Sequence, residues 1–395
     1  MPWRSSSPMD LRMQFFSDYL RGVFSISELS REYQISRPTA YKWINRYELG
    51  GAAELVDRSR RPHHVPRATP ADQVEALLTK RQRYPFWGAR KLLRLLTAEQ
   101  PEITWLKRAT ACDILARHKL TRKSRRRRPL GHPGKPTTVI TAPNQVWSAD
   151  FKGQFKTRDG YYCYPLTVTD NFSRYLLACQ ALSSTSQREA KPVFRRLFQE
   201  FGLPECIRTD NGGPFASVSL ARLSSLSAWF IRLGIRRELI EPGKPYQNGC
   251  HERMHRTLKA ETTRPPAGNR ATQQRRFNSW SSEFNHVRPH EALALDTPAQ
   301  HHQASPRPYP KRLPPLEYPS HFEVRRVGSN GCIRWRSERV HVSLVCAQEY
   351  LGLEAFDTGI WNVYFGSLKL GRLIEKELRI QDAYALSRPQ NIKNV

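Results

Sequence analysis

Apolar side chains in the first sixty residues recur at the spacing of two short amphipathic helices separated by a polar turn. Leu29 and Tyr33 stand four positions apart in the first helix. The second helix repeats apolar residues at Ala40, Trp43 and Ile44, and a glycine pair follows it as a stop signal. Two short helices joined in this way predict a helix-turn-helix unit.

The polar positions of the second helix fall on its other side. They are Arg37, Thr39, Lys42, Asn45 and Arg46. A face of this composition can read the major groove of DNA. The alternative is a small helical bundle whose polar face is only solvated. We favour DNA binding and predict a helix-turn-helix DNA-binding domain over residues 1–62.

Three further helix-length segments follow, at 71–83, 88–99 and 107–120, and a strongly basic stretch comes after them. This stretch contains Arg125, Arg126, Arg127 and Arg128. Such a run is often a solvated linker, but the first 140 residues hold 28 basic and only 12 acidic side chains. Contact with phosphates is therefore the better interpretation. A second helical, winged-helix or helix-turn-helix-like domain with a basic linker is predicted over residues 63–137.

Beyond residue 138 the apolar pattern becomes that of a mixed α/β sheet. Three β-rich runs lie between residues 144 and 183. Helical segments at 188–202 and 219–234 then alternate with two short strands, and two more helices follow. This order predicts one α/β domain over residues 138–300.

The last part of the chain reads differently again. Residues 301–318 are predicted to be a proline-rich linker. Short β-rich segments at tight spacing then predict a small β-barrel over residues 319–380.

Composition adds a partner class to this picture. The chain of 395 residues has 64 Lys and Arg against 35 Asp and Glu, a formal net charge of +29. This excess predicts a polyanionic partner, most simply nucleic acid, and a merely basic or ribosome-associated protein is the alternative. No apolar run is long enough to span a membrane, and the seven scattered cysteines form no metal-site or disulfide pattern. We therefore expect a cytoplasmic protein without a membrane partner.

Three carboxylates lie at positions where they could bind metal ions and support catalysis. Asp150 lies inside a strand among apolar and small residues, Asp210 closes another strand, and Glu252 begins a helix. Converging carboxylates repel one another unless they are protonated or bound to metal, and oxygen ligands suit Mg²⁺. Two ions held about 4 Å apart would support phosphoryl transfer. From spacing alone each acid could equally be a cap, a turn residue or half of an ion pair, and Asp170 is as eligible, although a turn-capping role suits it better.

Several segments resemble the integrase core of DDE transposases, in the same order along the chain. They are WSADFKG, TDNGGPF, PGKPYQNGCHERMHRTLKAE and RPHEAL, and WGARKLL and DRSRRPH resemble the N-terminal part of the same group. The group is the IS481/IS3 type of bacterial insertion sequences, more distantly similar to retroviral integrases. The resemblance implies an RNase H-like catalytic core, with Asp150, Asp210 and Glu252 as the catalytic and metal-binding triad. It also makes the C-terminal barrel similar to an SH3-like domain.

The interval from Asp210 to Glu252 is 42 residues, longer than in many members of the group. The extra residues fall between 217 and 230, where they would lengthen a helix or its entry loop. Glu238 and Glu241 are nearer to Asp210 but lack the motif context, so Glu252 remains the predicted third acid.

The predicted helix of Glu252 also carries Arg256 and Lys259 on the same face. We expect this face to contact DNA, although pairing of Glu252 with Arg256 along an exposed helix would explain Arg256 equally well.

Together these features predict a transposase that cuts the ends of an insertion sequence and joins the 3′-hydroxyls to target DNA. The expected cofactor is Mg²⁺ or Mn²⁺, as two ions. The expected partners are double-stranded DNA, as terminal inverted repeats and target, and further copies of the chain in a homo-oligomer on DNA. The protein would act at the bacterial nucleoid. The alternatives are an inactive, sequence-specific DNA-binding remnant or repressor, and a nuclease that hydrolyses DNA without joining strands.

Overall fold

The computed structural model describes residues 7–59, 68–121, 138–241 and 245–386. The chain divides into two compact units, Met1–Pro70 and Ala71–Val395. The basic run Arg125–Arg128 lies outside the described residues. In the described part of the chain, no helix is both long and apolar enough to cross a membrane. All seven cysteines are free thiols.

The first unit contains α1 (Pro8–Leu20), α2 (Ile26–Glu32), α3 (Arg37–Gly50) and the 3₁₀ helix η1 (Gly51–Leu55). The two predicted helices are α2 and α3, and the sequence pattern had not indicated α1. Phe15 and Phe16 of α1 pack with Leu29, Ala40 and Ile44 in one buried cluster. The first helix thus supplies the largest side chains of this small core.

The second unit begins with α4 (Ala71–Arg83), α5 (Ala89–Glu99) and α6 (Arg108–Arg117), which confirm the three predicted helices. Leu77, Trp87, Leu92 and Ile114 form the buried centre of this helical group.

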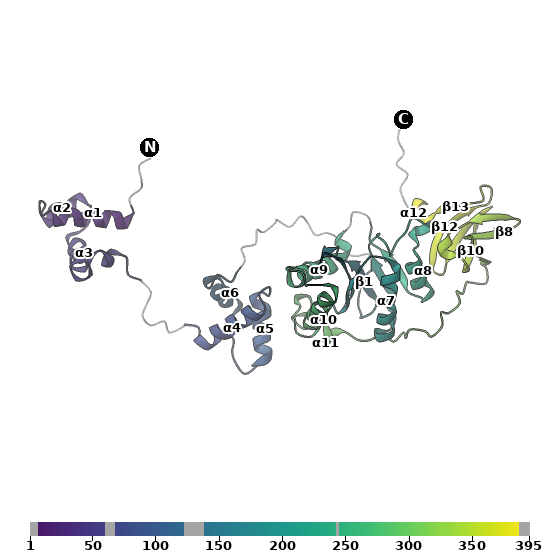
Figure 1. The fold of residues 1–395 in the computed structure, drawn as a ribbon, viewed down its shortest axis with the longest axis horizontal. Coiled ribbons are helices and arrows are strands. Elements are labelled where there is room, and N and C mark those ends of the chain that lie inside the picture. The colour runs from purple at the N-terminus through teal and green to yellow at the C-terminus, as the bar shows by residue number, and fades with distance from the viewer. Residues whose placement is uncertain (1–6, 60–67, 122–137, 242–244, 387–395) are drawn as a thin grey trace, which may run out of the picture. The chain divides into compact units, whose positions relative to one another are not determined.

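A mixed sheet forms the middle of the second unit, as predicted (Figure 1). Its strands are β1 (Val146–Phe151), β2 (Phe155–Lys156), β3 (Tyr162–Asp170), β4 (Leu176–Leu182), β5 (Cys206–Thr209) and β6 (Arg236–Leu239). The order is β4-β3-β1-β5-β6, with the short β2 also on β3. The first three long strands are antiparallel neighbours, whereas β5 and β6 run parallel to β1.

Helices cover both faces of this sheet. On one face α7 (Gln187–Phe201) and α8 (Ser225–Arg232) bury a large aromatic cluster. On the other face α9 (Gly249–Thr262) and α10 (Arg270–His286) pack against β3 and β4 through Met254, Leu258 and Phe277. Burial on both faces explains why β1 reads as a nearly continuous apolar run around Asp150.

The predicted helix over residues 219–234 is shorter in the structure. Only α8 is α-helical, because the preceding 3₁₀ turn η2 (Leu220–Arg222) contains the left-handed residues Ala221 and Arg222. Ala221 is buried in the C-terminal core, and its N–H donates to Asp382 Oδ1 at 2.9 Å. The extra residues between Asp210 and Glu252 therefore form an entry loop that packs against the C-terminal sheet.

After α10 the chain forms η4 (Glu291–Leu293) and α11 (Pro298–His301) and then enters the C-terminal all-β region. Its elements are β7 (Glu323–Arg326), β8 (Cys332–Trp335), β9 (Glu338–His341), η5 (Leu344–Cys346), β10 (Tyr350–Asp357), β11 (Ile360–Phe365), β12 (Leu368–Ile374), β13 (Arg379–Asp382) and α12 (Ala383–Leu386). Five strands form an antiparallel sheet in the order β13-β12-β11-β10-β7, and β8 pairs with β9. The all-β prediction is confirmed, although within the described residues the edge strands β7 and β13 do not pair with each other.

Candidate active site

Asp150 and Asp210 lie at the same level on adjacent parallel strands. In the pairing of β1 with β5, Ala149 is opposite Thr209. Asp150 directly follows Ala149 in the sequence, and Asp210 directly follows Thr209. Because parallel strands place their carboxyl ends at one edge of a sheet, the two aspartates meet at that edge.

Glu252 lies in the first turn of α9, close enough for its charge to act on Asp150. Burial, and after it the negative charges of Asp210 and Glu252, raise the pKa of Asp150 to about 7. The side chain of Asp150 is 22% exposed, whereas Asp210 and Glu252 are open to solvent. The structure thus brings the three predicted acids into one group, with Asp150 as its most enclosed member.

Two buried histidines of α9 stand behind this group, and the sequence analysis had not selected them. His255 Nδ1 lies 3.7 Å from Asp150 Oδ2. The hydroxyl of Thr167 on β3 contacts His255 Nε2 at 2.6 Å and His251 Nε2 at 2.8 Å. Thr169 contacts the other ring nitrogen of His251 at 2.8 Å. Their spacing of four residues on one helix face was the available signal.

The hydroxyl of Thr167 joins this network to the central strand. Its Oγ1 also donates to the carbonyl oxygen of Asp150 at 3.1 Å, so one side chain connects both imidazole rings to β1. Burial lowers the pKa of His251 to about 3 and that of His255 to about 2, so both rings are neutral.

One ligand atom from each of Asp150, His251 and His255 also lies within 4.8 Å of the others, close enough for the three residues to hold one metal ion. His251, however, uses both ring nitrogens in bonds to threonines, and a metal would displace one of these bonds. The three carboxylates fit a divalent cation better, because the cation would offset both the burial and the repulsion that raise the pKa of Asp150.

Other acids near the site are already occupied. Asp170 caps its turn, accepting the N–H of Ser173 at 2.9 Å and the N–H of Asn144 at 3.0 Å. Glu238 accepts from Arg208 Nε at 2.8 Å.

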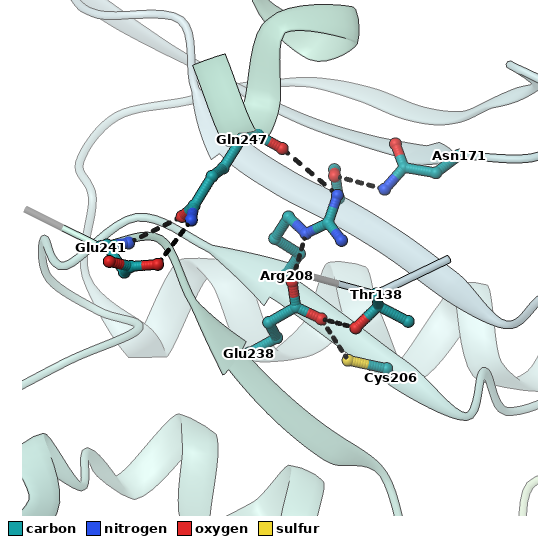
Figure 2. A network of polar contacts seen from close by, with 8 residues as sticks. Thr138, Asn171, Cys206, Arg208, Glu238, Glu241 and Gln247 are labelled. Carbon is teal, nitrogen blue, oxygen red and sulfur yellow. Dashed lines mark hydrogen bonds and ion pairs between the residues drawn. The ribbon is translucent and has the colours of Figure 1, made fainter. Parts of the chain in front are cut away.

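Figure 2 shows this second group of contacts around Arg208. Glu238 also accepts the hydroxyl of Thr138 at 2.6 Å, and Glu241 accepts from Gln247 Nε2 at 2.8 Å. Both glutamates that competed with Glu252 for the third position therefore have partners within the described structure.

Basic side chains gather on the same side of α9 as Glu252. Arg256 and Lys259 are both exposed. The pKa of Lys152 is lowered by burial and then by the charge of Lys259, so these two lysines lie near each other and near Asp150. Lys152 was missed from the sequence, although it follows Asp150 by only two positions.

The predicted recognition helix α3 presents only part of its polar set. Arg37, Lys42 and Asn45 are exposed, and Thr39 is half-buried with its hydroxyl 2.8 Å from that of Ser36. Arg46 does not lie on the outward side. Its side chain is 13% exposed, and it donates to the carbonyl oxygen of Val56 at 2.8 Å.

Comparison with known protein families agrees with this architecture. Two models described as "Integrase core domain" match residues 140–245 and 233–298. A "Helix-turn-helix domain" model matches residues 11–63, and a "Homeodomain-like domain" model matches residues 39–115. The chain therefore combines DNA-binding helical domains with an integrase core.

Two of the relatives are proteins of bacterial insertion elements. The chain is 29% identical over 241 residues to the 39.2 kDa protein of insertion element IS476 from Xanthomonas euvesicatoria, covering 60% of this chain and 67% of that protein. It is 26% identical over 258 residues to the 31.7 kDa protein of IS407 from Burkholderia multivorans, covering 64% and 87% respectively.

Among solved structures, the catalytic core domain of the HTLV-2 integrase in complex with magnesium is similar at 19% identity with a TM-score of 0.33. The match covers 41% of this chain and 98% of that domain.

The order of the matched domains and the relatives in insertion elements lead to one assignment. They support the function of a transposase or integrase of an insertion sequence, a polynucleotidyl transferase whose integrase core implies the use of a divalent metal.

Proposed function

We propose that Asp150, Asp210 and Glu252 form the catalytic centre that cuts the ends of the element and joins them to target DNA. The observation that carries this proposal is the register of β1 with β5, which brings Asp150 and Asp210 to one edge of the sheet, with Glu252 in the first turn of α9 near enough for its charge to act on Asp150. Three carboxylates at one edge of a sheet repel one another, and a bound cation would offset that repulsion.

The chemistry consists of two phosphoryl transfers at one site. In the first, the oxygen of water attacks a phosphorus atom at the element end, the bond to O3′ breaks, and the strand leaves with a free 3′-hydroxyl. In the second, that 3′-hydroxyl attacks a phosphorus atom of target DNA, and the O3′ atom of the target strand that was bonded to this phosphorus leaves. Neither step needs a covalent link between protein and DNA.

The three acids would hold Mg²⁺ or Mn²⁺, as two ions, and the metal would supply activation of the attacking oxygen and stabilisation of the leaving oxygen. Lys152, Arg256 and Lys259 would bind DNA phosphates beside the acids, since all three are cations on or near the same side of α9. His255 would keep the Asp150 carboxyl group oriented.

The helical domains would read the terminal inverted repeats through Arg37, Lys42 and Asn45, with Thr39 shaping the start of the helix. Both ends must be held together for joining, so the active form would be an oligomer on DNA. Cleavage and joining of DNA would take place at the nucleoid in the bacterial cytoplasm.

The test uses purified protein, labelled DNA from the flanking element ends, and Mg²⁺ or Mn²⁺. We expect nicks at the ends and joined strand-transfer products, both lost on chelation and in Glu252→Gln. Specific binding without metal-dependent cleavage would refute the catalytic proposal and leave a DNA-binding remnant. Cleavage without joining would indicate a nuclease.

A further inference from the structure

A basic cavity lies beside the N-terminus of α9. Its volume is about 560 Å³, and three arginines line it: Arg174 from the β3–β4 connection, Arg208 from β5 and Arg253 from α9. Among the described residues that line it there is no acid. The three predicted catalytic acids do not line it either, so it is a separate site.

Arg208 is the buried member of this group. Its side chain is 4% exposed, and Nε forms an ion pair with Glu238 Oε1 at 2.8 Å. Nη1 donates to the carbonyl oxygen of Gln247 at 3.3 Å, as Figure 2 shows. Nη2 is buried without a hydrogen-bond partner in the described structure. A buried guanidinium N–H left without an acceptor is destabilising, so an acceptor from a ligand in this cavity would stabilise Arg208.

Glu238 does not supply this acceptor in the described structure. One of its oxygens accepts from Arg208 Nε, and the other accepts the Thr138 hydroxyl at 2.6 Å and lies 3.8 Å from the Cys206 thiol.

The rest of the lining favours an anion. None of the described residues pairs with Arg174 or Arg253. Gly249 and Cys250, which open the fourteen-residue helix α9, also line the cavity, and Asn248 makes no side-chain cap there. The first N–H groups of α9 are thus available, and the helix dipole favours negative charge at this end.

We propose that this cavity binds one backbone phosphate of the DNA on which the transposase acts. The proposal rests on the proposed function for the identity of the strand. Arg253 directly follows Glu252 on α9, and adjacent Cα atoms are about 3.8 Å apart. A phosphate held by Arg253 would therefore be bound by the helix that also carries Glu252, and it would help to fix the register of the strand that passes the acids.

The experiment measures binding of the full chain to duplex DNA from an element end, in EDTA, over a series of NaCl concentrations. Working without metal separates this test from catalysis, so failure of the acid triad would not affect it. The variants are Arg253→Gln and Arg174→Gln. Arg195→Gln is the matched control, since Arg195 is an exposed arginine of the same domain on α7, across the sheet.

Loss of one phosphate contact should reduce the slope of log Kd against log[NaCl] by about 0.9, and the double variant should bind on the order of tenfold more weakly. Arg195→Gln should leave both values unchanged. Equal losses in all three variants, or no loss in Arg174→Gln and Arg253→Gln, would overturn the proposal.

A second arm distinguishes the source of the phosphate. Inorganic phosphate should raise the melting temperature of the wild-type chain relative to chloride at equal ionic strength, and the double variant should lose this effect. Stabilisation by inorganic phosphate with an unchanged DNA salt slope would assign the cavity to a free phosphorylated ligand and overturn the DNA assignment. No stabilisation and no slope change would overturn the site itself.

Discussion

The imidazole Nδ1 of His255 lies 3.7 Å from the carboxyl Oδ2 of Asp150, and the other nitrogen of the same ring is held at 2.6 Å by Thr167. The contact links α9 to β1, so the helix that carries Glu252 also orients the aspartate on the central strand. The ring is neutral and buried, which makes it a rigid support and not a charged partner of the acid.

His255→Ala should therefore slow cleavage by about 10–100-fold while leaving the affinity for end DNA unchanged, because only the orientation of Asp150 is lost. His255→Asn, which keeps a polar atom near the Nδ1 position, should retain more activity and a pH–rate profile closer to wild type. The measurement is single-turnover cleavage across pH, with the exposed His286→Ala as control. A parallel loss of DNA affinity would point to a structural role instead.

The enclosed position of Asp150 makes the stability of the core depend on pH. Its folded pKa of about 7 lies above the unfolded value of 3.8, so between these values the folded chain binds a proton that the unfolded chain has lost. Stability attributable to Asp150 therefore falls as pH rises from about 4 to about 7. In EDTA, Asp150→Asn should be more stable than wild type by roughly 2–4 kcal/mol at pH 8, with little difference near pH 4.

Denaturant unfolding of the two proteins at both pH values checks this, and Asp113→Asn on the exposed side of α6 controls for the loss of one carboxylate. Mg²⁺ at pH 8 should narrow the gap, since it would stabilise only the chain that retains Asp150. A gap of equal size at both pH values would contradict the raised pKa.

The ion pair between Arg208 and Glu238 should be required for folding of the sheet. Glu238→Gln leaves the buried guanidinium without its countercharge and should lower the free energy of unfolding by about 3 kcal/mol. Replacing both residues, as Arg208→Met with Glu238→Leu, should be less damaging, because no buried charge then remains unpaired. Urea unfolding followed by tryptophan fluorescence measures both. If the double variant is as unstable as Glu238→Gln, the unpaired charge of Arg208 is not the cause of the lost stability.

Two neighbouring cations on α3 should behave differently. Lys42 is exposed, so Lys42→Gln should weaken binding to the terminal repeats and reduce the salt slope by about one, with folding intact. Arg46 holds Val56 and lies 3.7 Å from Glu54, so Arg46→Gln should destabilise the first unit by about 1–3 kcal/mol. Hydrogen exchange over residues 8–50 of the full chain separates the two effects. Faster amide hydrogen exchange in Lys42→Gln would show that Lys42 stabilises the fold of the first unit and would contradict a role limited to DNA binding.

Much of the architecture could be predicted because local periodicity reports local burial. The alternation of apolar runs predicted a mixed sheet of five strands with its helices, to which the structure adds the short β2, and the helical spacing predicted α2 to α6. The prediction failed where the chain bends away from its apparent pattern. Residues 219–224 look helical, but Ala221 is drawn into the C-terminal core by contacts with residues far along the chain.

The candidate site shows the same division. The sequence by itself determined the strong positive charge, the order of the elements and the motif context of Asp150, Asp210 and Glu252, because these depend on neighbours within a few residues. Only the tertiary structure decided which acids are engaged elsewhere: Glu238 is held by Arg208 across two parallel strands, and Asp170 by its own turn. It also decided that Arg46 faces inward and that His255 supports Asp150, since hydrogen-bond partners are chosen by strand register and helix packing and leave no trace in local periodicity.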